Sequence, residues 1–587
     1  PYSAGRVSAV HILSSSRVLR AAPWLWVVLL NCLLFVPAYV CSTPEPSFWP
    51  TQVAHGGLLS RANQDVFRVS IDFACVLLCL LWTANPWVRR ALVALYGTLW
   101  IFLAYHHGVA YWFQRTPALV EDVQLGLNLL HFLGSFAHSS WRRDLAILAL
   151  VCGGLWLSAR CFAALQRRAA ETTLRTRVLL SVAVALPCVS SLVCFGVASD
   201  APVLQLASKR SYYNIQSARE EAQRMAAVEA AAPDRRYDAY EAVHLARKPD
   251  FYLMMMEAYG EILATWDMAP AYRALLARVE QRLSRVGYHA ASTYSRAPVH
   301  SGTSWFSIGS VHTGVSIQRP KAYALFQRHS AQVPTLTRFF RAQGYRSYAL
   351  QPGSTQRAGL TRSDVFEHDV FVDAITLAYT GKKYGFGRVP DQYALGAFRE
   401  RHFKPSDDPR YVFFMNVSTH YPWGDDVPPY ARDWRSLAQA GALQASDVDA
   451  SWPELPHSVE IGTPLRRSYF RSIAYAWRLL TEWFEAEAGK DSVIVVLGDH
   501  QPRLERNLPG AVTMNTPLHV FAKDPAFIQA LVERHGFQPG LYAHPEHTKL
   551  LRHEGLFSLV VSQLSASYGA KDVPLYPNGA PLPALKR

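Results

Sequence analysis

Two short apolar runs, each followed by metal-binding residue types, stand out along the chain. Residues 250–256 read Asp-Phe-Tyr-Leu-Met-Met-Met and precede Glu257, while residues 492–497 read Ser-Val-Ile-Val-Val-Leu and precede a glycine, Asp499 and His500. Continuous apolar runs of this length predict buried strands of an α/β sheet, whose functional sites lie at the carboxyl ends of the strands. Two carboxylates and an imidazole in that position predict a site for one divalent cation.

From residue 250 onward, strand-like apolar runs alternate with helical spacings. The pattern predicts strands over 251–256, 347–350, 411–417, 493–497 and 518–522, and helices over 271–286 and 466–487. Such alternation is typical of an α/β domain with a largely parallel central sheet covered by helices. Residues 425–463 are rich in Pro, Asp and Ser, and this composition predicts an inserted surface loop.

A turn rich in glycine and hydroxyl residues lies between the two candidate metal-binding strand ends. Residues 301–304 read Ser-Gly-Thr-Ser, and apolar residues at helical spacing follow, so we expect a helix to begin here. A hydroxyl at a helix N-terminus beside a cation can ionise, because the helix dipole and the metal both stabilise the alkoxide. The turn therefore supplies a candidate nucleophile for attack on phosphorus.

The first 200 residues are dominated by long apolar stretches. Four of them cover 23–41, 91–113, 144–165 and 178–198, and a weaker fifth covers 71–83. A helix that crosses a bilayer needs about 20 apolar residues, so we expect an α-helical membrane domain with about five transmembrane helices. Reading 71–83 as an interfacial helix instead would leave four crossings. The overall composition, 587 residues with 50% hydrophobic residues, fits a chain that is part membrane protein and part globular protein.

Arginine placement predicts the orientation of these segments. The loops on the side of the amino terminus hold more arginines than those on the other side, and such an excess marks the cytoplasmic face. With an odd number of crossings, everything after residue 200 lies outside the cytoplasm. The predicted organisation is a transmembrane domain over 1–200, a juxtamembrane linker helix and connection over 201–249, and an extracytoplasmic catalytic domain over 250–587.

Cysteine positions and net charge narrow the setting further. All eight cysteines fall in or beside the apolar segments of the first 200 residues, so the second half of the chain has no disulfide. The formal net charge of +14 divides evenly between residues 1–200 and the remainder, and a mildly basic second part suits a domain that works close to anionic lipid headgroups. Nucleic acid is not an expected partner, since no basic stripe interleaved with aromatic residues is present.

Four motifs give the chain a family resemblance. They are Met-Glu-Ala-Tyr-Gly260, Ser-Gly-Thr-Ser-Trp305, Ser-Thr-His-Tyr-Pro422 and Leu-Gly-Asp-His-Gln501. In this order they resemble the alkaline phosphatase and sulfatase superfamily, especially its membrane-anchored branch of lipoteichoic acid synthase and the phosphoglycerol and phosphoethanolamine transferases. The similarity covers residues 250–575. Ser304 lacks the Pro and Arg context of true sulfatases, and the cysteine-free second half departs from the disulfide-braced lipid A phosphoethanolamine transferases.

The resemblance implies roles for individual residues. The implied metal ligands are Glu257, Ser304, Asp499 and His500. Ser304 is also the implied nucleophile, because it lies ten residues before Gly314, which closes the predicted helix. Matching the Gly-x-Thr-Ser pattern of lipoteichoic acid synthase selects Thr303 instead, so Thr303 remains an alternative.

Three further residues are implied substrate contacts. His420 corresponds to a strand-end histidine that touches the substrate phosphate or protonates a leaving group, and Arg357 resembles a phosphate-contacting arginine. His519 lies in the strand that follows Asp499 and His500 in the sequence, where it either reaches the phosphate or serves as a core histidine.

The expected activity is that of a metal-dependent transferase in the bacterial inner membrane with a periplasmic catalytic domain. It would move a phosphoglycerol or phosphoethanolamine group from a phospholipid to an envelope glycan or lipid, using one Mn, Zn or Mg ion. A membrane-anchored phosphodiesterase or phosphatase is the alternative enzyme. A non-catalytic envelope assembly protein is a third possibility, and the intact set of metal-binding residues counts against it.

Overall fold

The structure is a computed structural model, and part of the chain is described in it. The described residues are 24–40, 70–113, 117–119, 122, 152–165, 167, 173–195, 207–354, 364–386, 389–403, 408–421, 423, 427–439, 443–452, 461–487, 489–502, 504, 513–547 and 550–586. The chain divides into two compact units: Pro1–Trp112 with Thr116–Glu221, and Phe113–Arg115 with Ala222–Arg587. The division falls inside the helix α7 (Ala207–Ala230), at the position of the predicted linker helix.

The first unit is helical. Its elements are α1 (Trp24–Val40), α2 (Ile71–Trp82), α3 (Pro86–Phe113), α6 (Leu174–Phe195) and most of α7. Within the described residues one helix, Pro86–Val109, is long and apolar enough to cross a membrane, and Leu25–Pro37, Ile71–Trp82 and Cys152–Leu165 are shorter apolar helices. Parts of the predicted segments 144–165 and 178–198 lie outside the described residues. The expected number of about five crossings therefore stays a prediction.

The second unit contains a nine-stranded mixed sheet with the strand order β4-β3-β5-β1-β6-β7-β2-β8, in which β9 also pairs with β2. Its strands are β1 (Asp250–Met256), β2 (His289–Arg296), β3 (Arg346–Gln351), β4 (Val370–Asp373), β5 (Arg410–Met415), β6 (Ser492–Gly498), β7 (Asn515–Ala522), β8 (Gln538–Pro539) and β9 (Leu551–Arg552). Strands β4, β3, β5, β1 and β6 run parallel, whereas β7 is antiparallel to both of its neighbours, β6 and β2. The parallel part contains the two apolar runs that carry the candidate metal-binding residues.

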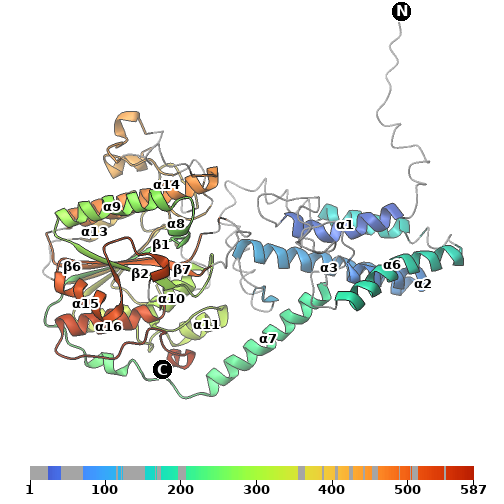
Figure 1. The fold of residues 1–587 in the computed structure, drawn as a ribbon, viewed down its shortest axis with the longest axis horizontal. Helices are drawn as coiled ribbons and strands as arrows, with labels where there is room; N and C mark the ends of the chain where they lie inside the picture. The colour runs from blue at the N-terminus through green and yellow to red at the C-terminus, as the bar shows by residue number, and fades with distance from the viewer. Residues whose placement is uncertain are drawn as a thin grey trace, which may run out of the picture. The chain divides into compact units, whose positions relative to one another are not determined.

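Helices cover both faces of this sheet, as Figure 1 shows. One face carries α9 (Ala269–Arg285), α13 (Asp391–His402) and α14 (Pro464–Ala486), and the other carries α10 (Ser304–Thr313), α15 (Pro525–His535) and α16 (Gly555–Tyr568). Along β1, Phe251, Leu253 and Met255 belong to one hydrophobic core and Tyr252, Met254 and Met256 to the other. Because side chains alternate along a strand, a run that is apolar at every position has to be buried on both faces.

The register of the parallel strands places the site at their carboxyl ends. Strands β1 and β6 are parallel and in phase, with Met256 opposite Gly498, so Glu257 and Asp499 leave the sheet at the same level. The backbone N–H of Asp499 donates to the carbonyl oxygen of Met256 (3.1 Å), which extends the ladder to the first residue of the site. Asn416, the residue after β5, is held to the carbonyl oxygen of Met255 in the same way (3.1 Å).

The segment 425–463 differs from the predicted surface loop. Its described part contains two short 3-10 helices, Trp434–Ala438 and Ala445–Asp447, and it buries Ala431 and Leu437. Gly396 of α13 permits this packing, since a Cβ there would lie 2.4 Å from the indole ring of Trp434. The segment is therefore partly integrated into the core.

The carbonyl groups that end α7 are capped from a distant part of the sequence. The Lys586 ammonium group donates to the carbonyl oxygens of Val228 (3.1 Å), Glu229 (2.6 Å) and Ala231 (2.5 Å). The last carbonyls of a helix have no partner inside the helix. A lysine in this position supplies hydrogen-bond donors to them, and its positive charge interacts favourably with the negative end of the helix dipole.

Candidate active site

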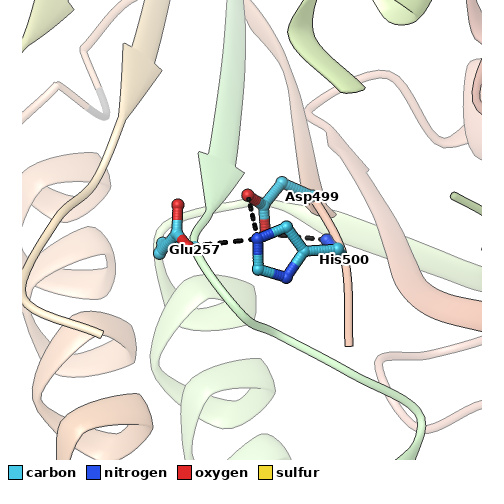
Figure 2. Close-up of side chains that lie close together, drawn as sticks. All are labelled: Glu257, Asp499 and His500. Atoms are coloured by element: carbon cyan, nitrogen blue, oxygen red, sulfur yellow. Dashed lines mark hydrogen bonds and ion pairs between the residues drawn. The ribbon is translucent and has the colours of Figure 1, made fainter. Parts of the chain in front are cut away.

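Three buried ligand-type side chains converge at the carboxyl ends of β1 and β6. One ligand atom from each of Glu257, Asp499 and His500 lies within 4.8 Å of the other two. The His500 Nε2 atom is 3.2 Å from Glu257 Oε1 and 3.3 Å from Asp499 Oδ2, and Figure 2 shows the imidazole between the two carboxylates. The adjacent carboxyl ends of two parallel strands thus bring together residues that are more than 240 positions apart in sequence.

The backbone around Asp499 fixes the two carboxylate oxygens differently. Oδ1 accepts hydrogen bonds from the N–H groups of Ala258 (2.7 Å) and His500 (2.7 Å). Ala258 has a left-handed backbone with φ of 54°, an uncommon conformation for alanine, and this turns its N–H toward Asp499. Oδ2 is buried and accepts no hydrogen bond from the described residues.

The Ser304 hydroxyl completes the group. It donates to Glu257 Oε2 (2.8 Å) and lies 3.3 Å from His500 Nε2. Ser304 is the first residue of α10, and Gly314 ends that helix in a left-handed conformation (φ 70°), as the spacing predicted. A negative charge on the serine oxygen is therefore favoured by the N-terminus of the helix.

Thr303 lies beside this group but faces elsewhere. Its hydroxyl donates to the carbonyl oxygen of Gly302 (2.6 Å), and its backbone is left-handed with φ of 56°. That conformation costs a β-branched residue about 1–3 kcal/mol, which is typical of functional turns. The strained turn directs the Ser304 hydroxyl, rather than that of Thr303, toward Glu257.

Electrostatics couple the ionisable groups of this cluster. Burial raises the pKa of Glu257, but the charges of His420 and His500 outweigh burial and bring it to about 2. Burial and the neighbouring Glu257 charge raise the pKa of Asp499 well above its usual range. Burial lowers the pKa of His500, but the two carboxylates outweigh it and raise the pKa to about 9. The protein alone therefore holds the two carboxylates together only by retaining protons.

These residues fit a divalent cation. The His500 Nδ1–H donates to the carbonyl oxygen of Gln501 (2.9 Å), so Nε2 is the ring nitrogen beside the carboxylates, where it accepts the Gly302 N–H (3.0 Å). Asp499 Oδ2 lacks any donor among the described residues, and a cation would satisfy it. Glu257, Asp499, His500 and Ser304 together offer oxygen and nitrogen ligands of the kind that Zn, Mn and Mg accept.

His420 lies next to this cluster. Its Nδ1 contacts the carbonyl oxygen of Tyr421 and must therefore carry the hydrogen, so Nε2 faces Glu257 Oε1 at 3.8 Å. The ring of Phe386 stacks on the imidazole at 3.7 Å between centroids. Burial lowers the pKa of His420, in part opposed by the charge of Glu257. The imidazole is thereby held in one tautomer and one orientation beside the candidate nucleophile.

His519 occupies a different environment. Ser292 donates to the carbonyl oxygen of Gly540 (2.8 Å), so it accepts from His519 Nδ1–H (2.8 Å), and His519 Nε2 accepts from the Tyr259 hydroxyl (2.9 Å). Both ring nitrogens are thus occupied inside the core, and none is left for a phosphate. Burial lowers the pKa of His519 to about 3, in keeping with a neutral core histidine. Arg357 lies outside the described residues.

Supporting residues around the site were not predicted from the sequence. Asn416 accepts the Glu257 N–H (2.7 Å), and Asp391 accepts the N–H of Ser418 (2.8 Å) in the loop that leads to His420. His553 Nε2–H donates to the carbonyl oxygen of Gly498 (3.0 Å), directly before Asp499. Asn416 lies near the end of the predicted strand 411–417 and follows the observed strand β5. Asp391 and His553 gave no signal in the sequence, since nothing local links them to strand ends more than 20 residues away.

No family model matches this chain, and no curated protein matches it. Solved structures do match. The lipoteichoic acid synthase LtaP from Listeria monocytogenes is 15% identical, with 60% of this chain and 81% of that chain covered and a TM-score of 0.36. The integral membrane lipooligosaccharide phosphoethanolamine transferase EptA from Neisseria meningitidis is 13% identical, with 84% and 87% covered and a TM-score of 0.47.

A hydrolase is also among the matches. The phosphonate monoester hydrolase SpPMH from Silicibacter pomeroyi is 13% identical, with 54% of this chain and 73% of that chain covered and a TM-score of 0.31. A protein of the alkaline phosphatase superfamily from Vibrio parahaemolyticus is 14% identical, with 56% of this chain and 70% of that chain covered and a TM-score of 0.33. At these identities the likeness is one of fold, and it does not decide between transfer and hydrolysis.

Proposed function

We propose that this protein is a metal-dependent transferase that moves a phosphoglycerol or phosphoethanolamine group from a phospholipid to an envelope glycan or lipid. The single observation that carries the proposal is the Ser304 hydroxyl, 2.8 Å from Glu257 Oε2 and 3.3 Å from His500 Nε2 at the start of α10. A hydroxyl placed among metal-binding groups at a helix N-terminus is arranged as a nucleophile rather than as a helix cap.

The reaction would take place in two displacements. A divalent cation bound by Glu257, Asp499 and His500 would lower the pKa of the serine hydroxyl and neutralise charge on the phosphoryl oxygens. In the first displacement the Ser304 oxygen attacks phosphorus, the bond to the diacylglycerol oxygen breaks, and diacylglycerol leaves with a proton. In the second, the acceptor hydroxyl attacks the phosphoserine, gives up its proton and releases Ser304.

His420 is suited to contact the transferred group. Its Nε2 faces Glu257 at 3.8 Å, and Phe386 and the Tyr421 carbonyl fix the ring. An imidazole held beside the reacting oxygens can bond a phosphoryl oxygen or exchange a proton with the leaving or entering hydroxyl. Thr303 remains the alternative nucleophile, although its hydroxyl is bonded to Gly302.

The proposal includes the setting of the reaction. Residues 1–200 would cross the inner membrane about five times, 201–249 would link the domains, and 250–587 would act in the periplasm. The apolar span Pro86–Val109 and the arginine bias of the loops support this placement. A donor lipid would then keep its acyl chains in the bilayer, which avoids about 0.8 kcal/mol for each methylene exposed to water.

Intact-protein mass spectrometry tests the proposal. After incubation with metal and labelled phosphatidylglycerol or phosphatidylethanolamine, the wild-type protein should gain the mass of one headgroup phosphate ester on Ser304. Addition of a glycan or lipid acceptor should remove that mass and label the acceptor. Rapid loss of the label to water at an unchanged rate with and without acceptor would identify a hydrolase instead.

A further inference from the structure

The helical unit contains a half-buried cation that forms no ion pair with an acid of the described residues. Arg210 lies in the first turns of α7, and its Nη1 is 2.6 Å from Nε2 of His107 in α3. A guanidinium only donates, so this imidazole nitrogen accepts, and His107 is neutral. No ion pair joins Arg210 to a carboxylate of the described residues, and burial lowers its pKa to about 10. The positive charge is therefore uncompensated within the described residues.

The polar groups around Arg210 are engaged with one another. Asp122 accepts the Tyr105 hydroxyl (2.6 Å) and the N–H of Ala118 (3.0 Å). The Asn214 side chain accepts the N–H of Leu119 (3.0 Å) and donates to the carbonyl oxygen of Arg210 (3.3 Å). Asp122 thus holds the chain segment after α3, and four of the five guanidinium N–H donors of Arg210 have no partner in the described residues.

The position of the pair corresponds to the headgroup level of a membrane. His107 lies two residues before the end of the apolar span Pro86–Val109. On α7, Tyr212 and Tyr213 follow Arg210 and are 58% and 59% exposed. Exposed tyrosines at the end of an apolar span are typical of the membrane–water interface, where lipid phosphates lie.

We propose that Arg210, oriented by His107, binds the phosphate of a membrane phospholipid, at a site built from other residues than the Ser304 group. The fork of a guanidinium matches two phosphate oxygens, and the unpaired donors supply the bonds. A neutral polar headgroup would leave the charge uncompensated. This inference rests on the proposed placement of the helical unit in a membrane.

Lipid binding by the full-length protein tests the site. The Ser304→Ala protein in detergent micelles is titrated with dioleoyl phosphatidylglycerol, with dioleoylglycerol and with inorganic phosphate, and the complexes are counted by native mass spectrometry. Because the lipid complex itself is counted, the binding result is independent of the reaction that the wild type performs. We expect saturable binding of the phospholipid, no binding of dioleoylglycerol, and no displacement by millimolar phosphate.

Variants on the same helix decide the assignment. Arg210→Gln should weaken phospholipid binding about tenfold or more, and Arg210→Lys less, because a lysine keeps the charge without the fork. Arg219→Gln removes an exposed charge from α7 and should leave binding unchanged. Equal losses for Arg210→Gln and Arg219→Gln, or none for either, would overturn the site. Displacement of the lipid by phosphate would overturn the assignment to a lipid.

Discussion

Both ends of strand β1 carry buried acids, but only the acid at the amino end is paired with a cationic side chain of the protein. At the amino end, Asp250 receives two side-chain hydrogen bonds from Arg410 (2.8 and 2.6 Å), and the same guanidinium is 2.9 Å from Glu487. At the carboxyl end, Glu257 and Asp499 lie 3.2 and 3.3 Å from the imidazole of His500, whose single positive charge cannot balance both acids. The amino end of β1 thus has a cation supplied by the protein, the Arg410 side chain. The carboxyl end has the ligand types that would bind a metal cation.

The difference separates stability from function. A buried acid that is paired inside the protein contributes to the folded state and is costly to uncover. A buried acid without a partner destabilises the folded state and is retained where it binds something. Burial of a carboxylate is therefore uninformative by itself, and its partners decide between the two roles.

The largest expected effect is on turnover. Ser304→Ala should lower kcat at least about a thousandfold, because the covalent route is lost, while the thermal midpoint of unfolding stays nearly unchanged. Thr303→Ala is the matched control and should retain most activity, since that hydroxyl bonds Gly302. Single-turnover assays with labelled phospholipid measure both. An active Ser304→Ala protein beside an inactive Thr303→Ala protein would assign the reaction to Thr303.

The amino end should show the inverse behaviour. Arg410→Met leaves Asp250 buried without its cation, and we expect a loss of about 3–5 kcal/mol in stability. Arg399→Gln removes the half-exposed partner of Glu487 and should cost less than about 1 kcal/mol. Thermal unfolding compares the two, and the metal affinity of the folded fraction should not change. Similar thermal midpoints for Arg410→Met and Arg399→Gln would contradict a stabilising role of the buried Arg410–Asp250 pair.

At the carboxyl end, Asp499→Asn removes a charge that has no permanent partner. The amide oxygen can still accept the N–H groups of Ala258 and His500, so the metal-free protein should be as stable as wild type or slightly more stable. Metal at a hundred times its Kd should stabilise the wild type by about 2.7 kcal/mol and the variant by much less. Calorimetry with and without Zn or Mn measures this. A metal-free Asp499→Asn protein that melts well below wild type would show that the acid is structural.

The last and most gradual effect concerns buried histidines whose ring nitrogens are hydrogen-bonded inside the protein. Burial lowers the pKa of His519 to about 3 and that of His553 to about 4, from an ordinary value of 6.5. Below pH 6.5 these histidines bind protons in the unfolded chain but stay neutral in the folded protein, so the free energy of unfolding falls as the pH falls toward about 4. Each histidine contributes a slope of about 1.4 kcal/mol per pH unit in this window. His519→Gln should flatten the pH dependence of unfolding by that amount, and an unchanged slope would contradict it.

Sequence reasoning located the parts of the fold whose burial shows in the residue types. Strands β1 and β6 are apolar after their first residues, and the residues that follow them, Glu257, Asp499 and His500, lie together as this pattern predicts. Strand β2 was missed because it is rich in hydroxyl residues. Ser292, Thr293 and Ser295 are all buried, and their partners, such as His519 and His553, are more than 220 residues away. Local patterns cannot show a hydroxyl that is satisfied by a distant strand.

The same limit applies to the site. Glu257, Asp499 and His500 follow apolar runs and could be found by position, and Ser304 by its spacing to Gly314. His519 was considered as a phosphate contact because it follows a strand-like pattern, but the Tyr259 and Ser292 hydroxyls occupy its nitrogens. The direction in which a strand residue faces depends on the neighbouring strands, and these become known only from the topology.

The cap that Lys586 places on α7 has a consequence for biosynthesis. The carbonyls that it satisfies lie at residues 228–231, more than 350 positions earlier, so the end of the helix stays uncapped until almost the entire catalytic unit has left the ribosome. Strand β2 likewise waits for β7, β8 and β9, which follow it in synthesis by more than 200 residues. Helices of the first unit form early from local contacts, whereas the sheet closes only after residues 515–552 have been synthesised. Partly made chains would thus carry open sheet edges, and a chaperone that shields them would be needed most for this unit.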